Sequence, residues 1–236
     1  MSHELIYTLD DLCFRGYLAL PETNSFPAPG VLIAPSWVGC SALAQKQARS
    51  LAAKGYVAMV LDPYGEGQTG ATAEACEALM SPLIHRRDIL LERLKAALNA
   101  LASRPEVDSA RIVALGYCFG GLCVLDLARW GAALAGVISV HGLFTPPAIP
   151  GGAPIRAKIL ILHGFEDPMA QPEEALRLGR ELTQREADWQ LHLFGSTAHA
   201  FTNPEANNPD FGTVYHPLAE ARSERLIEDF MAEVVK

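Results

Sequence analysis

The chain has 236 residues, of which 50% are hydrophobic, and a formal net charge of -8. This length and composition predict a single domain over residues 1–236, because α/β folds of this size commonly form one unit. The acidic balance argues against sequence-independent binding to nucleic acid or anionic lipid, which needs clustered Lys and Arg, so we expect a small-molecule partner.

Short apolar runs alternate with helical patterns along the chain. Runs too short for a helix predict strands, and their continuous apolar character is typical of a mostly parallel sheet covered on both faces. The predicted strands lie at residues 12–20, 31–34, 56–62, 111–115, 136–141, 158–162 and 189–194. This alternation predicts a doubly wound α/β sheet.

Helices and loops fill the intervals between these strands. The predicted helices lie at residues 41–54, 71–102 with a break at Pro82, 120–130, 173–186 and in a closing segment that ends at 235. The predicted loops lie at residues 21–30, 35–40, 63–70, 142–157 and 203–217.

The sequence Gly-Tyr-Cys-Phe-Gly-Gly at residues 116–121 joins a predicted strand to a predicted helix. A reactive side chain on such a sharp turn has strained backbone angles, so the residues around it must be small. Gly116, Gly120 and Gly121 meet this requirement around Cys118. The pattern is typical of the nucleophile elbow of the α/β-hydrolase fold, with cysteine in the usual serine position. The N–H groups that open the following helix favour a thiolate.

Cys118 could instead be a buried structural cysteine, since free cysteine is among the most buried residue types. A catalytic role needs an acid and then a histidine later in the chain. Asp167 follows the predicted strand at 158–162, and His199 follows the one at 189–194. Each lies just past a strand, at the edge where such a sheet carries its active site. The order predicts a Cys-Asp-His triad.

This chain resembles the dienelactone hydrolases, cysteine-nucleophile members of the α/β-hydrolase superfamily, over nearly its whole length. The motifs that carry the resemblance are residues 116–121, Ala-His-Ala-Phe-Thr-Asn-Pro at 198–204 and, more weakly, Asp-Pro-Tyr-Gly at 62–65. The resemblance implies that Cys118 is the nucleophile, His199 the base and Asp167 the orienting acid. Such a triad hydrolyses an ester, lactone or thioester through an acyl-enzyme.

The fold also predicts an oxyanion hole made of two backbone N–H groups. One comes from Phe119, the residue after the nucleophile. The other comes from the loop at 35–40, where we assign Trp37. Because any residue type supplies a backbone N–H, Trp37 could equally be an ordinary apolar cover.

Five residues are candidates for contact with the substrate: Ser36, Tyr64, Arg86, Arg87 and Asn203. Tyr64 could line the pocket or be a half-buried loop aromatic. Arg86 or Arg87 could hold an anionic substrate, as an arginine of this region does in the dienelactone hydrolases, or simply be solvated. Those enzymes carry a glutamate where this chain has Ser36 and an arginine where it has Asn203. The resemblance therefore implies a substrate other than dienelactone itself.

The Ser36 position also bears on the resting state of Cys118. In the dienelactone hydrolases the glutamate disfavours a free-standing thiolate, and a serine hydroxyl cannot do this. We therefore expect Cys118 to rest as a thiolate paired with protonated His199. Alternatively, another carboxylate such as Glu66 takes the glutamate's place.

The five cysteines are odd in number and show no Cys-x-x-Cys spacing. This disfavours a disulfide framework and a zinc site, so we expect reduced thiols, no metal and no cofactor. The N-terminus lacks the basic and long apolar segments of a secretory signal, and no later apolar run approaches the roughly 18 residues of a membrane span. We therefore expect a cytoplasmic protein.

Other residues leave alternatives open. His141 and His163 end predicted strands, where they could line the site or have a hydrogen-bonded structural role. Cys123 is expected to be a packing residue. The alternative functions are a thioesterase, a non-catalytic ligand-binding member of the fold, or a thiol redox protein that uses Cys118 with Cys40 or Cys123.

Overall fold

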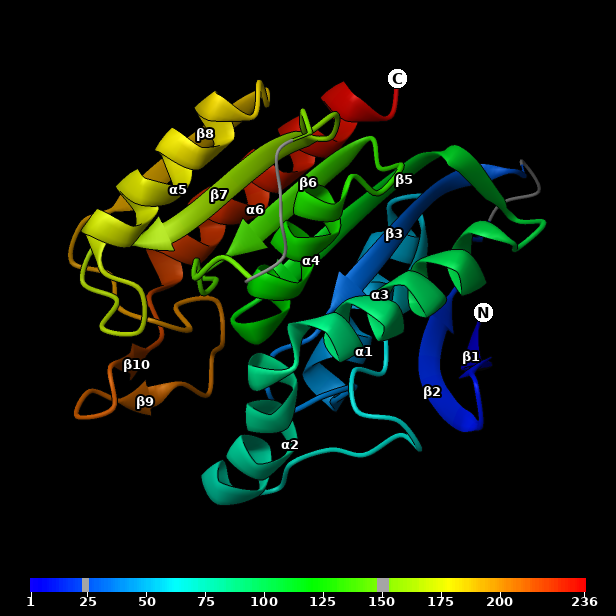
Figure 1. Ribbon diagram of the computed structural model, residues 1–236, viewed down its shortest axis with the longest axis horizontal. Helices are drawn as coiled ribbons and strands as arrows, with labels where there is room; N and C mark the ends of the chain where they lie inside the picture. Colours follow the sequence, from blue (N-terminus) through cyan, green and yellow to red (C-terminus); the bar gives the residue numbers. More distant parts are fainter. Residues whose placement is uncertain (23–25, 148–152) are drawn as a thin grey trace.

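The computed structural model describes residues 1–22, 26–147 and 153–236. Its main sheet has eight strands in the order β1-β2-β4-β3-β5-β6-β7-β8 (Figure 1). Strands β1 and β2 are antiparallel to each other, β2 is antiparallel to β4, and the pairs from β4 to β8 are parallel. The predicted fold class, a doubly wound α/β-hydrolase sheet, is confirmed.

The strands at the centre of this sheet are short and largely buried, as the apolar runs predict. They span Ser2–Leu9 (β1), Leu12–Ala19 (β2), Ala28–Ala34 (β3), Val57–Val60 (β4), Val107–Tyr117 (β5), Gly136–Val140 (β6), Lys158–Gly164 (β7) and Trp189–Phe194 (β8). All residues of β4 and β6 are buried, which is the burial expected of central strands covered on both faces.

Helices cover both faces of the sheet. They span Ala42–Ala53 (α1), Ala73–His85 (α2), Arg87–Ala102 (α3), Phe119–Trp130 (α4), Pro172–Gln184 (α5) and Pro217–Val234 (α6). Helices α3, α4 and α5 pack on one face, and α1 and α6 pack on the other (Figure 1). No helix in the described ranges has both the length and the hydropathy needed to cross a membrane.

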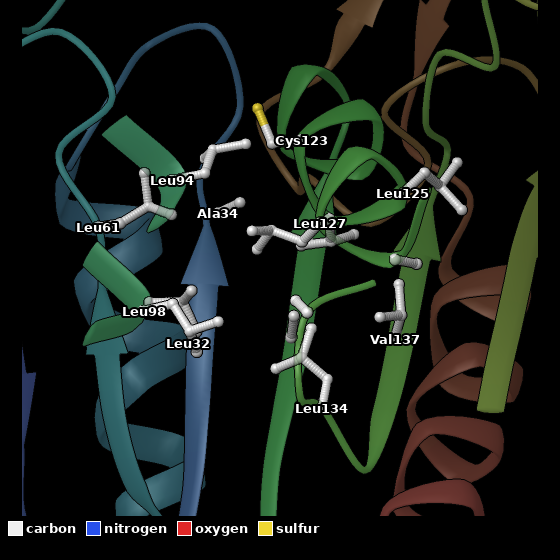
Figure 2. Close-up of a cluster of buried hydrophobic side chains, with 14 of the residues drawn as sticks. Leu32, Ala34, Leu61, Leu94, Leu98, Cys123, Leu125, Leu127, Leu134 and Val137 are labelled. Carbon is white, nitrogen blue, oxygen red and sulfur yellow. The ribbon is translucent and has the colours of Figure 1, made fainter. Parts of the chain in front are cut away.

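The larger of two apolar clusters lies between the sheet and helices α3 and α4. Figure 2 shows leucines of these helices packed beside Leu32 of β3 and Val137 of β6, with Cys123 at one end. Cys123 is 1% exposed, so its predicted packing role is confirmed. The cluster fixes α4, and with it the turn that precedes this helix.

Three sequence-based predictions need correction. The turn predicted at residues 21–30 ends earlier, since β3 begins at Ala28, which pairs with Val107 of β5; residues 23–25 lie outside the described part of the chain. The predicted strand at 111–115 begins earlier, at Val107. The break predicted at Pro82 falls at Arg86 instead. A proline lacks only its own N–H, and the Pro82 carbonyl still accepts a hydrogen bond from the Arg86 N–H at 3.0 Å.

Two elements were not predicted. Strand β1 is an edge strand whose residues are mostly exposed, so it lacks an apolar run. The predicted loop at 203–217 contains a small hairpin, formed by Asn207–Asn208 (β9) and Thr213–Val214 (β10). This hairpin lies beyond the arrowheads of β6 and β7 in Figure 1, at the carboxyl edge of the sheet. Part of the loop predicted at 142–157, residues 148–152, lies outside the described residues.

Candidate active site

Cys118 occupies a strained turn between β5 and α4. Its φ of 55° and ψ of -118° place it in a region that residues with a β-carbon rarely adopt. The Cys118 N–H donates a hydrogen bond to the Val140 carbonyl of β6 at 3.1 Å, and its own carbonyl accepts one from Gly121 at 2.9 Å. The side chain therefore projects from a turn that the neighbouring elements hold in place.

Three glycines make this turn possible because the backbone closes tightly around it. A β-carbon on Gly116 would lie 2.0 Å from the Gly120 carbonyl oxygen, and one on Gly120 would lie 1.9 Å from the Ala34 carbonyl oxygen. A β-carbon on Gly121 would lie 2.6 Å from Cα of Gly142. Contacts of this length are far inside van der Waals separation, so any larger residue would displace backbone.

Asp167 and His199, predicted from separate loops, lie together at the carboxyl edge of the sheet. The Nδ1 atom of His199 is 2.7 Å from Oδ2 of Asp167, and both residues are 1% exposed. Because a carboxylate accepts, Nδ1 carries the proton and Nε2 is free to face the thiol. The other carboxylate oxygen of Asp167 accepts the Met169 N–H at 2.8 Å, which fixes its orientation.

The backbone of His199 is held by the hairpin that the sequence did not predict. The His199 N–H donates to the Gly212 carbonyl at 2.9 Å, and its carbonyl accepts the Val214 N–H at 3.1 Å. Gly212 in turn packs closely on Pro168, next to the candidate acid. The hairpin therefore links the loops of the two triad partners.

Cys118 and His199 lie close enough to shift each other's pKa. Burial raises the pKa of the Cys118 thiol, but the neighbouring His199 imidazolium, with the N–H groups of Phe119 and Trp37, outweighs burial and lowers it. Burial likewise opposes the charged form of His199, yet Cys118 and Asp167 raise its pKa to about 10. Although Nε2 of His199 makes no regular hydrogen bond to a described residue, this coupling favours a thiolate beside an imidazolium.

The two candidate oxyanion donors affect the thiol of Cys118. The backbone N–H groups of Phe119 and Trp37 both lower its pKa. The Tyr64 hydroxyl donates to the Trp37 carbonyl at 2.6 Å, and the Tyr64 ring stacks on Phe119 with a centroid separation of 6.3 Å. On its outer side, the Trp37 ring stacks on Phe211 of the hairpin loop at 6.0 Å.

Asp62 organises the loop that carries Tyr64, a role that the sequence reasoning missed. This carboxylate is 1% exposed and accepts the backbone N–H groups of Tyr64 and Gly65 on one oxygen and of Arg15 and Gly67 on the other. The signal was present in the weak motif at 62–65, which contains both Asp62 and Tyr64.

The two candidate arginines form ion pairs elsewhere. Arg86 is paired with Asp88 through Nε and an Nη atom at 2.9 and 2.7 Å. Arg87 is buried and forms a bidentate pair with Asp126 of α4, with both contacts at 2.7 Å. The structure thus gives both guanidinium groups partners within the chain.

The remaining candidates lie on loops near the triad. Ser36 is half-buried in the loop at 35–40, and its carbonyl accepts the Gly39 N–H at 3.0 Å. The Asn203 side chain accepts the Glu205 N–H at 3.1 Å. Glu66, the alternative carboxylate, lies 4.0 Å from Arg15. None of the groups with the largest effects on the pKa of Cys118 is a carboxylate.

His163 supports the acid loop, and the cysteines are all free. The Nε2 atom of His163 donates to the Ala170 carbonyl at 2.7 Å and lies 3.8 Å from Oδ2 of Asp167. Cys40 and Cys123, the partners that a redox reaction would need, are free thiols like Cys118. Burial raises the pKa of Cys40 to about 11 and that of Cys123 well above its usual value, so neither resembles an activated thiol.

Several known proteins are similar to this chain in sequence or structure. An uncharacterized protein of Caenorhabditis elegans is 37% identical over 151 residues, which cover 63% of this chain and 96% of that protein. The solved structure named m3DLH is 34% identical, covers 100% of this chain and 99% of its own, and superposes with a TM-score of 0.95. The crystal structure of a dienelactone hydrolase-like promiscuous phosphotriesterase from metagenomic libraries is 32% identical, with the same coverage and TM-score. The sequence profile of the dienelactone hydrolase family matches residues 14–235, and the chain therefore belongs to this family of hydrolases.

Proposed function

We propose that the protein hydrolyses a carboxylic ester or lactone through an acyl-enzyme formed on Cys118. The observation that carries this proposal is the coupling of Asp167, His199 and Cys118. It consists of the 2.7 Å bond between the acid and the histidine and the mutual pKa shifts of the histidine and the thiol. Membership of a hydrolase family supports the reaction class.

In the proposed reaction, the Cys118 thiolate attacks the carbonyl carbon, and the electron pair of the C=O bond moves to its oxygen. The backbone N–H groups of Trp37 and Phe119 stabilise this oxyanion. When the tetrahedral intermediate collapses, the C–O bond to the leaving group breaks and the Nε2 proton of His199 passes to the leaving oxygen. A water molecule, deprotonated by the same imidazole, then attacks the thioester carbon. The C–S bond breaks, the acid leaves, and the Cys118 thiolate is restored beside protonated His199.

Asp167 has a supporting role in both half-reactions. Its carboxylate keeps the proton of His199 on Nδ1 and stabilises the imidazolium without touching the substrate. A lactone suits this sequence of steps because its leaving alkoxide stays tethered, so that the product is one ring-opened acid.

We further propose that the substrate lacks the carboxylate that dienelactone carries. Arg86 and Arg87 are both paired with aspartates of the chain, and Asn203 has no charge. Holding an anion would require one of these pairs to break, and a bidentate pair as buried as that of Arg87 is costly to break.

A second activity follows from one relative. A protein whose name describes a promiscuous phosphotriesterase is 32% identical to this chain. We propose that the same thiolate also attacks the phosphorus of uncharged phosphotriesters, with the oxyanion donors holding the phosphoryl oxygen. The P–O bond to the leaving group breaks, His199 protonates the departing oxygen, and water then cleaves the P–S bond to restore the thiolate. The inference fails if wild-type protein that hydrolyses aryl esters releases no alcohol from an aryl phosphotriester.

The test of the main proposal is release of chromophore from activated aryl esters and ring opening of lactones by wild type and Cys118→Ala. We expect a burst equal to the enzyme concentration followed by steady turnover in the wild type, and neither in the variant. Circular dichroism of Cys118→Ala checks that the fold is intact. Folded wild-type protein that shows neither burst nor turnover with a broad ester and lactone panel would indicate the non-catalytic alternative.

A further inference from the structure

His141 is a buried residue in a strained conformation beside the triad. It follows the last residue of β6 and is 3% exposed. Its φ of 39° lies in the left-handed region, which costs free energy for a residue with a β-carbon and which glycine adopts freely. The turn is tight because Gly142 lies against Gly121 in the first turn of α4. A histidine at a position that favours glycine indicates that its side chain makes a contact that offsets the backbone strain.

The His141 side chain contacts three residues of the segment that carries His199. Its Nε2 atom lies 2.9 Å from the Thr202 hydroxyl. Its ring meets the His199 ring edge-on, with centroids 5.1 Å apart and an interplanar angle of 63°. It also meets the Phe201 ring at 5.2 Å and 83°. One buried imidazole thus spans this segment from the side of β6.

The other restraints on His199 act elsewhere on the residue. Asp167 holds the Nδ1 atom of the ring, Gly212 holds the backbone N–H, and Val214 of β10 holds the backbone carbonyl. A single bond at Nδ1 leaves the ring able to tilt about that bond. The segment also turns sharply at Ala200, whose φ is 56°. His141 adds a ring-to-ring contact to these restraints.

The surroundings of His141 keep its imidazole neutral. The titratable groups that face it are His199 in the segment after β8, His163 at the end of β7 and Tyr117 at the end of β5. Burial, followed by the charges of His199 and His163, lowers the pKa of His141 well below its usual value. A neutral ring can pack against the His199 imidazolium without repelling it.

We propose that His141 is a positioning residue, which holds the His199 imidazole toward Cys118 through its bond to Thr202 and its edge-on ring contact. His141 does not contact the thiol or the reacting atoms. The inference rests on the proposed role of His199 as the base. It explains the buried imidazole, and the strained backbone is then tolerated because a histidine supplies both the hydrogen bond to Thr202 and the ring contact.

Three variants separate the two contacts. Thr202→Val removes the hydrogen bond and keeps the shape of the side chain, His141→Phe keeps a ring and loses the bond, and His141→Ala loses both. We expect about a fivefold fall in kcat for each of the first two and about a 50-fold fall for His141→Ala, with KM unchanged, because misplacing a catalytic group lowers kcat. Phe230→Leu, at a buried position of α6 itself, is the control for a general loss of stability.

A second measurement needs no substrate. A loosely held imidazolium stabilises the thiolate less, so the pH dependence of iodoacetamide labelling at Cys118 should shift upward in His141→Ala, toward the roughly 8.5 of a free cysteine. Phe230→Leu should leave this profile unchanged. If His141→Ala does not fold, the same comparison is made with His141→Phe and Thr202→Val.

The outcomes distinguish this inference from the proposed function. Wild-type kcat and an unshifted labelling profile in folded His141→Ala, or in both milder variants where it does not fold, would overturn the positioning role. Turnover that persists in Cys118→Ala would overturn the proposed function instead. In that case the labelling profile still decides whether His141 orients His199 toward the thiol.

Discussion

The Tyr64 hydroxyl donates a hydrogen bond to the carbonyl oxygen of Trp37 at 2.6 Å. The acceptor belongs to the same residue whose backbone N–H lowers the pKa of the Cys118 thiol. Tyr64 therefore restrains the loop at 35–40 that carries Trp37. Asp62 in turn restrains Tyr64, because its carboxylate accepts the Tyr64 backbone N–H. From the sequence, Tyr64 could line the pocket or be a half-buried loop aromatic. In the structure it is hydrogen-bonded to Trp37, the residue proposed as an oxyanion donor.

Tyr64→Phe should lower kcat by about tenfold while KM stays near the wild-type value. The variant keeps the ring that stacks on Phe119 and loses only the hydroxyl. Removing an oxyanion donor outright costs roughly 100- to 1,000-fold, so loosening one should cost less. The loss of stability should be about 1 kcal/mol, as for one buried hydrogen bond. Unchanged kcat in steady-state assays would show that the Tyr64 bond does not position Trp37.

Gly116→Ala should unfold the elbow, with a loss of about 3 kcal/mol or more in the free energy of unfolding. The added β-carbon would lie 2.0 Å from a backbone oxygen, which cannot move without displacing α4. Gly195→Ala is the matched control, because a β-carbon there meets no atom within 4 Å. Urea denaturation of both variants checks the difference, and equal stability would contradict the steric account.

Asp167→Asn should lower kcat by about 100- to 10,000-fold, because the amide can donate to Nδ1 and so favour the wrong tautomer of His199. The effect should be smaller than that of Cys118→Ala, since the carboxylate does not touch the substrate. Single-turnover and steady-state rates with an aryl ester measure it. A wild-type rate would instead assign the orienting role to another carboxylate, and Glu166, the preceding residue, would be examined first.

Labelling of Cys118 by iodoacetamide should persist well below pH 7. A lowered thiol pKa leaves the thiolate present as the pH falls, until the pH passes that lowered pKa. At the other end, His199 should lose its proton as the pH rises through about 10. Ser36→Glu should slow labelling near neutral pH, since a nearby carboxylate raises the pKa of the thiol. A single titration near 8.5 that Ser36→Glu leaves unchanged would contradict a resting ion pair.

The sheet and the elbow could be predicted from the sequence because their signals are local. Continuous apolar runs marked the buried strands, and the glycines around Cys118 marked a turn that is tight in the structure. Strand β1 was not predicted, because an exposed edge strand needs no apolar run. The helix break was placed at Pro82 and not at Arg86, because the sequence does not reveal how a helix accommodates an internal proline.

The contacts that organise the site could not be predicted, because they join distant parts of the chain. The Tyr64 hydroxyl and the Trp37 carbonyl are 27 residues apart, and His141 and Thr202 are 61 apart. Nothing in the local pattern around any of these residues specifies its partner. The ion pairs of Arg86 and Arg87 are similar, since a helix arginine beside a pocket and one in an internal pair have the same local sequence.

The most direct test of the central claim is the mass of the protein after rapid acid quenching of a reaction with a slowly deacylating aryl ester. A covalent acyl-enzyme predicts a mass increase equal to one acyl group, located by peptide mapping on Cys118 and absent in Cys118→Ala. An acyl group on another residue, or steady turnover by folded Cys118→Ala, would contradict the assignment of Cys118 as the nucleophile.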